Sequence, residues 1–316
     1  MPALPSAPDN NYLLRPGFDS LYLFLHVFTK LNSAVEQLNV SPFKQLFVKR
    51  DDTIDPFISG NKWRKLKYLL EKARLQNKKH LVTFGGAYSN HVLATASAAS
   101  RNGLRATAFI RGENVVNEML VMCNLFGMEL IFTDRESYRE KPALYNRYFG
   151  TNPDSFFIDE GGASEEATLG CAEIIEELPE VYDHIFCAAG TGTTAAGLLK
   201  GIRKHRLPTT LHVVPVLKGG SFIGEEIQKY LPLNTDIQLH LDYHFGGYAK
   251  TQESLIEFIK KFTRTTGLLI DPVYTSKMFY AITDLEKHGI LKPDDKILAI
   301  HTGGLMGIFG MKDKFI

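Results

Sequence analysis

Short β-rich runs alternate with helical stretches along almost the whole chain, and several of the runs end in glycine. This alternation is typical of parallel strands joined by crossover helices, so it predicts an α/β fold. Helical stretches such as 61–74, 89–103 and 193–206 repeat apolar residues at three and four positions. The predicted strands are 45–50, 80–86, 105–112, 128–133, 155–162, 184–190, 211–216, 237–242 and 296–304.

Length and charge narrow the class of protein. With 316 residues and 44% hydrophobic content, the chain can bury one large core or two modest ones. Its 36 lysines and arginines nearly balance 35 acids, so no overall charge favours nucleic acid or an anionic membrane. No segment approaches the roughly 18 uninterrupted apolar residues of a membrane span. We therefore expect a protein that acts on a small molecule.

The cysteines and the N-terminal segment bear on the compartment. Cys123, Cys171 and Cys187 form no CxxC pair and lie in or beside apolar runs, as free thiols usually do. Residues 1–20 lack the basic start and apolar segment of a secretory signal, and their Pro, Ser and Asn content predicts a loose arm. A reducing, cytoplasmic location is the prediction.

The first candidate functional residue is Lys62, in the run ISGNKWRKL at 58–66, where a Gly-Asn turn meets an amphipathic helix. A lysine at such a junction is more often a solvated surface residue. To act as a Schiff-base nucleophile it must be partly desolvated, which lowers its pKa and provides the free amine. Position alone leaves both roles open.

Two further motifs lie where a predicted strand meets a helix. The run FGGAYSNH at 84–91 offers the Ser89 hydroxyl and the Asn90 amide to a crevice, although Ser89 also fits a simple helix cap. The run AAGTGTT at 188–194 lets backbone N–H groups converge on an anion, assisted by the helix dipole. It lacks the end of a Walker A loop and the acid of a dinucleotide site, so one phosphate is predicted. A plain turn is the alternative.

These motifs occur in a fixed order with DPVY at 271–274 and HTGG at 301–304, and together they resemble D-cysteine desulfhydrase and 1-aminocyclopropane-1-carboxylate (ACC) deaminase. The resemblance implies the tryptophan synthase β-like fold, called fold type II, with two domains of parallel twisted sheets flanked by helices. It also implies a pyridoxal 5′-phosphate (PLP) cofactor and a homodimer. The expected large domain is 1–62 plus 162–316, and the expected small domain is 63–161.

The resemblance also assigns roles to single residues. Lys62 would form the Schiff base with the cofactor, Asn90 would bond its 3′-oxygen, and Thr302 would face its ring nitrogen. Tyr274 would stack near the ring and share proton transfer with Ser89. The phosphate would be bound mostly through backbone N–H groups of Gly190, Thr191, Gly192, Thr193 and Thr194.

The expected substrate-binding residues include a second tyrosine whose alignment is less direct. Family members carry a Gly-Tyr-Gly turn, and Gly247-Tyr248-Ala249 is the nearest match here. Tyr88 and Trp63 replace residues that are usually different in the family, so both are candidates to reshape the pocket. Histidines such as His91, His244 and His301 are better interpreted as packing or hydrogen-bonding residues, and the sequence shows no metal-ligand cluster. The expected substrate-binding residues are Ser89, Asn90, His91, Tyr248 and Thr275.

The resemblance favours β-elimination from D-cysteine, which gives pyruvate, sulfide and ammonia. In the family, Glu directly after the DPVY tyrosine accompanies ACC deamination and Thr accompanies D-cysteine desulfhydration, and this chain has Thr275. A hydroxyl from Thr302 at the ring nitrogen would give a milder electron sink than a carboxylate. The alternatives are ACC deamination, another β-elimination or replacement, and a noncatalytic ligand-binding α/β protein. An NAD-binding oxidoreductase fits less well.

Overall fold

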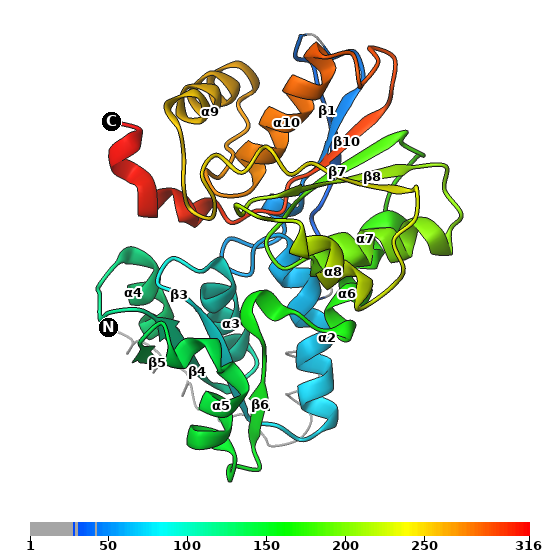
Figure 1. The fold of residues 1–316 in the computed structure, drawn as a ribbon. Helices are drawn as coiled ribbons and strands as arrows, with labels where there is room; N and C mark the ends of the chain where they lie inside the picture. Colours follow the sequence, from blue (N-terminus) through cyan, green and yellow to red (C-terminus); the bar gives the residue numbers. More distant parts are fainter. Residues whose placement is uncertain (1–27, 29–30, 42) are drawn as a thin grey trace, which may run out of the picture.

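The computed structural model describes residues 28, 31–41 and 43–316, and the predicted N-terminal arm lies outside them (Figure 1). The chain forms two sheets, and every strand pair except β1–β2 is parallel. The large sheet has the order β1 (Val35–Leu38), β2 (Leu46–Lys49), β10 (Ile297–Ile300), β7 (His184–Ala189), β8 (Thr210–Pro215) and β9 (Ile237–Leu239). The small sheet has the order β5 (Met128–Thr133), β4 (Arg105–Arg111), β3 (His80–Gly86) and β6 (Ser155–Phe157). The α/β prediction is therefore confirmed.

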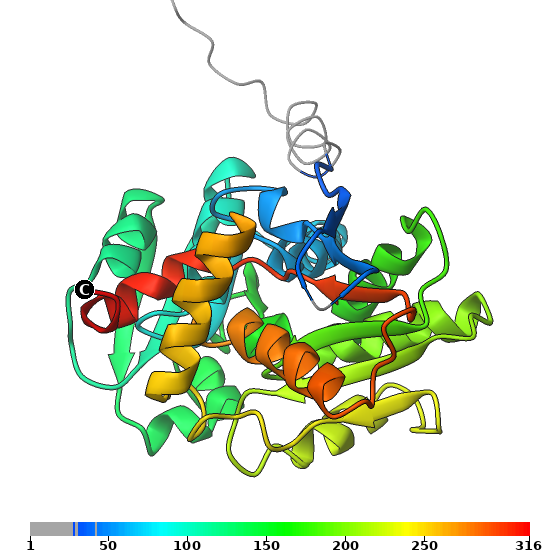
Figure 2. The same cartoon turned by 90° about the horizontal axis from the view of Figure 1, so that it is seen from above.

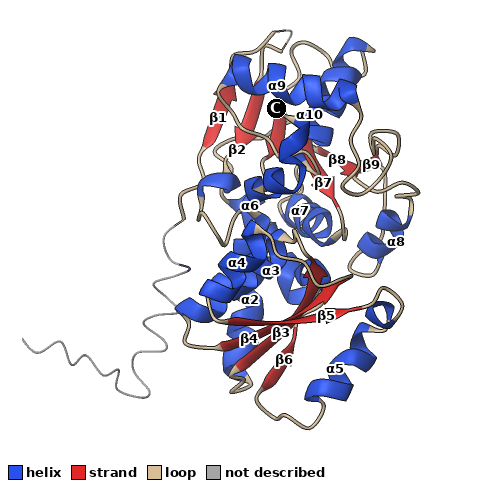
Figure 3. Ribbon diagram, turned by 90° about the vertical axis from the view of Figure 1, so that its left-hand side faces the viewer, coloured by secondary structure: helices blue, strands red, loops and turns tan. Residues whose placement is uncertain are grey.

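Helices cover both faces of each sheet, as parallel strands with crossover connections require. Two helices, α2 and α6, pack against each other, and with α3 and α7 they lie between the two sheets (Figure 3). Helices α9 and α10 cover the outer face of the large sheet (Figure 2). The bounds are α2 (Asn61–Leu75), α3 (Asn90–Arg101), α4 (Glu118–Leu125), α5 (Lys141–Phe149), α6 (Glu165–Glu176), α7 (Thr193–Lys204), α8 (Phe222–Gln228), α9 (Glu253–Thr266) and α10 (Thr275–Lys287).

All nine predicted strands are present, several of them shorter than expected, and one further strand was not predicted. The strand expected over 155–162 ends at Phe157, because Gly161 and Gly162 adopt positive φ angles of 69° and 70° inside a short 3-10 turn. Strand β1 was not predicted, since only Val35 and Leu38 of its four residues are apolar and it pairs on one side alone. The strands of the small sheet all come from 80–157, but the domain boundaries themselves stay a prediction.

A buried ion-pair network fixes the start of α2 to the large sheet. Arg64 is fully buried and binds Asp51 through two hydrogen bonds of 2.7 and 2.8 Å. The same guanidinium donates to both carboxylate oxygens of Glu177, at 2.6 and 2.9 Å, and Lys49 Nζ also reaches Glu177 at 2.8 Å. Buried charges persist only when they are paired in this way. Arg64 follows Lys62 by two residues, so the network also limits where Lys62 can lie.

The described residues contain neither a candidate membrane span nor a candidate metal cluster. No helix in that part of the chain is both long enough and apolar enough to cross a membrane. The same residues contain no group of three or more His, Cys, Asp or Glu side chains that could hold a metal ion. The three cysteines are buried free thiols.

Candidate active site

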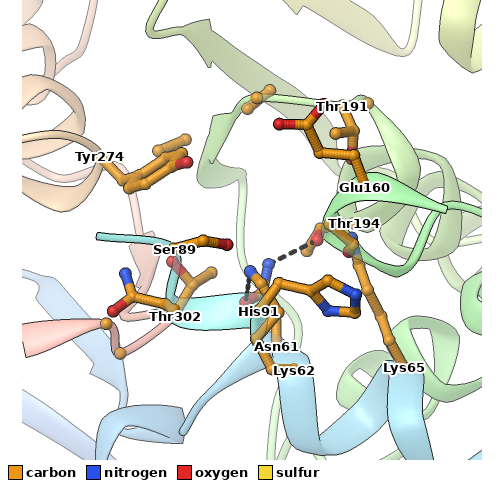
Figure 4. A pocket seen from close by; sticks show the side chains of 18 of the residues that line it. Asn61, Lys62, Lys65, Ser89, His91, Glu160, Thr191, Thr194, Tyr274 and Thr302 are labelled. Atoms are coloured by element: carbon orange, nitrogen blue, oxygen red, sulfur yellow. Dashed lines mark hydrogen bonds between the residues drawn. The ribbon is translucent and has the colours of Figure 1, made fainter. Parts of the chain in front are cut away.

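A cavity of about 270 Å³ opens where strands of both sheets end (Figure 4). Its walls include Gly86 at the end of β3, Ala189 at the end of β7, and the segment 302–304 after β10. Such a place beyond the carboxyl ends of parallel strands is where open α/β sheets bind ligands. Of the predicted site residues, the cavity brings together Lys62, Ser89, Asn90, His91, Gly190, Thr191, Gly192, Thr194, Tyr248, Tyr274 and Thr302.

Lys62 is the second residue of α2 and is partly exposed to the cavity. The turn before it is tight: Gly60 has a φ of 59°, and a Cβ there would lie 1.8 Å from the Thr302 carbonyl oxygen. Lys62 Nζ donates to Asn61 Oδ1 at 2.8 Å. Burial, and then the nearby Lys65 charge, lower the pKa of Lys62 to about 7. Much of this lysine is therefore a free amine at neutral pH, as a nucleophile requires.

A second lysine, Lys65, lies one helical turn further along the same face of α2. It is 2% exposed, and its Nζ donates to the Gly161 carbonyl oxygen at 3.1 Å. Burial lowers the pKa of Lys65 as well. Lys65 lines the cavity, and its ammonium form has two further N–H donors, so it is suited to hold an anion there.

The start of α7 is open toward the cavity. Its N-cap is Gly192, with a φ of 74° and no side-chain cap, so the first-turn N–H groups are left for another acceptor. A Cβ at Gly190 would lie 3.2 Å from Tyr274 Cε1. A side chain at position 190 would therefore fill the part of the cavity between the 190–192 loop and Tyr274. An uncapped helix start, a cavity-lining Lys65 and this space together fit a phosphate group.

Gly192 lines the cavity, and its backbone and α8 explain why position 192 has no side chain. A Cβ on Gly192 would lie 3.2 Å from Glu226 Cβ and 3.3 Å from Ile227 Cγ1, on the side of α8. Gly192 is therefore required by its positive φ and by the contact with α8. Thr193 is fully buried beside it and does not line the cavity, although its Oγ1 lies 3.3 Å from Thr191 Oγ1.

The start of α3 faces the same cavity and is capped. Ser89 Oγ accepts a hydrogen bond from Val92 N at 3.4 Å, as predicted for a helix N-cap. His91 is buried, and its Nε2 lies 2.8 Å from Thr83 Oγ1 while its Nδ1 has no hydrogen-bond partner among the described residues. Burial, followed by the charges of Lys62 and Lys65, holds the pKa of His91 well below its usual value, so the ring is neutral.

Two tyrosines meet above the cavity. Tyr274 Oη donates to Tyr248 Oη at 3.3 Å, and the ring centroids lie 6.0 Å apart in an edge-on arrangement. Burial raises the pKa of both hydroxyls, and for Tyr274 the neighbouring Tyr248 adds to the rise. Both phenols therefore keep their protons at neutral pH.

The sequence predicts that Thr275 binds the substrate, but Thr275 does not line the cavity. It is fully buried, its Oγ1 donates to Asp271 Oδ1 at 2.7 Å, and Asp271 N donates to the same Oγ1 at 2.9 Å. The Asp271 carboxylate also accepts hydrogen bonds from Tyr274 N and Thr275 N at the start of α10. The hydroxyl is thus part of the turn at which α10 begins, where the Asp271 carboxylate accepts the first backbone N–H groups.

The two unusual residues Trp63 and Tyr88 do not line the cavity either. Trp63 is 3% exposed and packs in the core beside the small sheet. Tyr88 is partly exposed, with its ring against the backbone at Gly310. Neither side chain reshapes the pocket directly.

The cavity also has charged residues that the sequence motifs missed, among them Lys65, Arg111 and Glu160. Arg111 Nη1 lies 4.0 Å from Glu160 Oε1. Lys65 could have been found as the residue three after Lys62 on one helix face. Arg111 and Glu160 lie near the ends of the predicted strands 105–112 and 155–162. They come together because β3 pairs with β4 and also packs against the 160–162 turn.

Comparison with known proteins agrees with this geometry. The chain matches the family model described as pyridoxal-phosphate dependent enzyme over residues 28–303. A Pyrococcus furiosus protein provisionally named as an ACC deaminase is 33% identical over 294 residues, covering 86% of this chain and 88% of the relative. The D-cysteine desulfhydrase of Salmonella paratyphi A is 29% identical over 302 residues, covering 86% and 90%.

Solved structures share the fold. The crystal structure of an ACC deaminase homologue superposes with a TM-score of 0.79 at 27% identity, covering 96% of this chain and 99% of that one. Threonine deaminase isoform 2 from Solanum lycopersicum has a TM-score of 0.65 at 14% identity, covering 94% and 93%, and shares the fold alone. The predicted fold type II architecture and PLP cofactor are confirmed by these matches. The chain belongs to the pyridoxal-phosphate dependent enzyme family, as a lyase or deaminase of the group that contains ACC deaminases and D-cysteine desulfhydrases.

Proposed function

We propose that this enzyme eliminates the β-substituent of D-cysteine, or of a similar β-substituted amino acid, and releases pyruvate, sulfide and ammonia. The observation that carries the proposal is the chemistry of the cavity wall around Thr302. Thr302 lines the cavity with a hydroxyl, and of the described lining residues Glu160 is the one acid. Figure 4 shows Glu160 beside Thr191, away from Thr302. The proposed wall at the cofactor ring therefore lacks a carboxylate.

The buried Asp271 carboxylate, close to Tyr274 in the chain, does not supply a carboxylate to this wall of the cavity. Asp271 uses both oxygens on amide groups of 273–275 and on the Thr275 hydroxyl, and it does not line the cavity. Opening the strained ring of ACC without first removing an α-proton needs strong polarisation, which a hydroxyl supplies poorly. Elimination from cysteine needs less, because thiolate is a good leaving group.

PLP, when bound, supplies an electron-withdrawing ring that stabilises negative charge at the substrate carbon next to nitrogen. We assign its phosphate to the N–H groups at the start of α7 and to Lys65. Lys62 Nζ, a free amine in much of the population at pH 7, can hold the cofactor and accept the α-proton. The Ser89 and Asn90 end of α3 would bind the substrate. The Tyr274 hydroxyl keeps its proton because burial raises its pKa, so it can donate to the leaving group.

ACC deamination is the second candidate, and the names of several relatives favour it. They include the bifunctional D-cysteine desulfhydrase and ACC deaminase of Arabidopsis thaliana, 29% identical over 299 residues and covering 85% of this chain and 75% of the relative. The two activities share a cofactor and a fold. They differ in the bond that breaks first, and the products separate them.

The test measures pyruvate from D-cysteine, L-cysteine and D-serine beside 2-oxobutyrate from ACC. We expect D-cysteine to have the highest kcat/KM and Thr302→Val to retain most of it. We expect Thr302→Glu, which places a carboxylate at the proposed ring position, to lower D-cysteine turnover. If ACC is turned over fastest by the wild type, the substrate proposal is wrong. A homodimer in the cytoplasm is the assembly and location that we propose with this activity.

A further inference from the structure

Lys277 is a fully buried lysine close to the active site that none of the proposed catalytic steps uses. It is the third residue of α10 and is 0% exposed. An ammonium near the N-terminus of a helix faces the positive end of the helix dipole. Burial of an unpaired charge is also strongly unfavourable. The side chain therefore needs partners that compensate for both effects.

Those partners are three backbone carbonyl oxygens. Lys277 Nζ donates to Val216 O at 3.1 Å, to His244 O at 2.8 Å and to Gly247 O at 2.8 Å. An ammonium has three N–H donors, so every donor has an acceptor here. The arrangement is that of a small cation held by the carbonyl groups of two separate loops.

Both loops lead directly to the cavity. Val216 follows β8, and the next residue, Leu217, lines the cavity. His244 and Gly247 belong to the turn that ends at Tyr248, whose hydroxyl meets Tyr274. Tyr274 immediately precedes α10, the helix that carries Lys277. The start of α10 therefore holds both tyrosines. Tyr274 belongs to its backbone, and the turn that carries Tyr248 is bound by the Lys277 ammonium.

The turn around Tyr248, residues 244–249, has a backbone that requires outside support. Phe245 and Ala249 adopt positive φ angles of 50° and 52°, and the two glycines between them have φ angles of 95° and 121°. Non-glycine residues in this region are unfavourable unless their surroundings hold them there. Two of the three carbonyls bound by Lys277 lie in this turn, so the ammonium opposes its relaxation.

We propose that Lys277 is a positioning residue, a built-in cation that fixes the 244–248 turn against α10 and sets the Tyr248 hydroxyl opposite that of Tyr274. The inference rests on the proposed place of these tyrosines in the active site. Truncation of the side chain leaves three carbonyl oxygens around an empty space. A small alkylammonium ion has the charge and the N–H donors to occupy it.

The test uses the holoenzyme with Lys277→Ala and with Lys277→Met, which fills the space without a charge. Lys287→Ala, at an exposed position on the same helix, is the matched control. We expect kcat of Lys277→Ala to fall about 100-fold with a smaller change in KM, as misplacement of a reacting group by about 1 Å produces. Hydrogen exchange of the 244–250 amides should speed up, while PLP content stays at the wild-type level.

Ammonium, methylammonium, ethylammonium and propylammonium chlorides are then added in turn. We expect one of the alkylammonium ions to restore kcat and slow exchange in Lys277→Ala, and to have no effect on the wild type, on Lys277→Met or on Lys287→Ala. In a Tyr248→Phe background, Lys277→Ala should lower kcat far less than in the wild type, because coupled residues are not additive.

Several results would overturn the proposal. They are an unchanged kcat in Lys277→Ala, a lost kcat with normal amide exchange, rescue of neither property by any ammonium ion, or full additivity with Tyr248→Phe. Insolubility of both Lys277 variants would assign the residue to folding of the whole chain and would equally reject the proposal. If the wild type degrades none of the four test substrates, the proposed function fails, and amide exchange with its rescue still decides the role of Lys277.

Discussion

Two helices begin at the cavity, one after a strand of each sheet, and they begin in different ways. Helix α3 starts at Ser89, whose hydroxyl accepts the Val92 amide, so part of its first turn is satisfied within the helix. Helix α7 starts at Gly192, which has no side chain to do this. The same strand–turn–helix unit can thus provide a side-chain hydroxyl for a reaction or open backbone amides for an anion.

The largest expected effect comes from removing Lys62, which tests whether the start of α7 binds PLP without the covalent bond to this lysine. We expect Lys62→Ala to lose turnover by about 10³-fold or more while PLP still binds at α7 without a covalent link. Borohydride reduction and peptide mapping of the wild type should find the cofactor on Lys62. Cofactor mapped to Lys65 would reject the assignment, and a variant unable to bind PLP at all would show that α7 is insufficient alone.

A second test adds a side chain to a glycine in the loop before each of the two helices. Gly190→Val places a side chain against Tyr274, and we expect PLP affinity to fall more than about 100-fold, or roughly 2.7 kcal/mol. Gly86→Ala is the counterpart on the α3 side, where a Cβ would meet only Arg111 Nη2 at 3.8 Å. Fluorescence titration of the apoenzymes compares them, and equal affinities would contradict an anion site at α7.

A third test sharpens the role of the capped helix. Ser89→Ala removes a cap and a proposed catalytic hydroxyl, so we expect a loss of about 1 kcal/mol in unfolding free energy and about 100-fold in kcat. Ser164 caps α6 in the same way, through Ala167 N at 3.1 Å, and does not line the cavity. Ser164→Ala should match the stability loss and keep kcat. Urea unfolding measures the stability of both variants, and steady-state kinetics measure their kcat. Equal losses of kcat in Ser89→Ala and Ser164→Ala would mean that Ser89 acts only as a helix cap.

The smallest effect concerns pH and the amine that lies between the two helices. Burial lowers the pKa of Lys62 to about 7, so protonation removes the nucleophile below that pH. The rate of covalent PLP attachment to apoenzyme should rise about tenfold per pH unit below pH 7 and level off above it. Stopped-flow absorbance measures this rate. A rate that keeps rising to pH 10 would instead mark Lys62 as an ordinary solvated lysine.

The elements that the sequence predicts best are those formed by contiguous residues. Strand β7 and helix α7 follow from an apolar run, a glycine turn and a helical repeat that are contiguous at 184–206, and the open helix start between them follows as well. Strand β1 escaped because two of its four residues are polar and it lies at the edge of the sheet. Hydrophobic pattern alone does not reveal such a strand.

Most of the predicted site residues in short motifs line the cavity, whereas residues outside these motifs were missed. Arg111 and Glu160 come from segments almost 50 residues apart, and only packing brings them to one wall. Thr275 shows the opposite error, since its neighbour Tyr274 does line the cavity but a helix-start turn with Asp271 takes the Thr275 hydroxyl. Adjacent residues in a motif can therefore have unrelated surroundings.

The order of strands in the large sheet has a consequence for synthesis of the chain. Strand β10 lies between β2 and β7, so a strand from residues 297–300 joins one made from 46–49 to one made from 184–189. Domains generally fold as units while the chain is being made, so this sheet can be completed only after β10 has emerged. The turn that carries Lys62 rests on the Thr302 carbonyl, with Asn61 N donating to it at 3.4 Å. We therefore expect capture of the cofactor by Lys62 to come late in biosynthesis, and a chain cut short before residue 297 to retain PLP less well than the full chain.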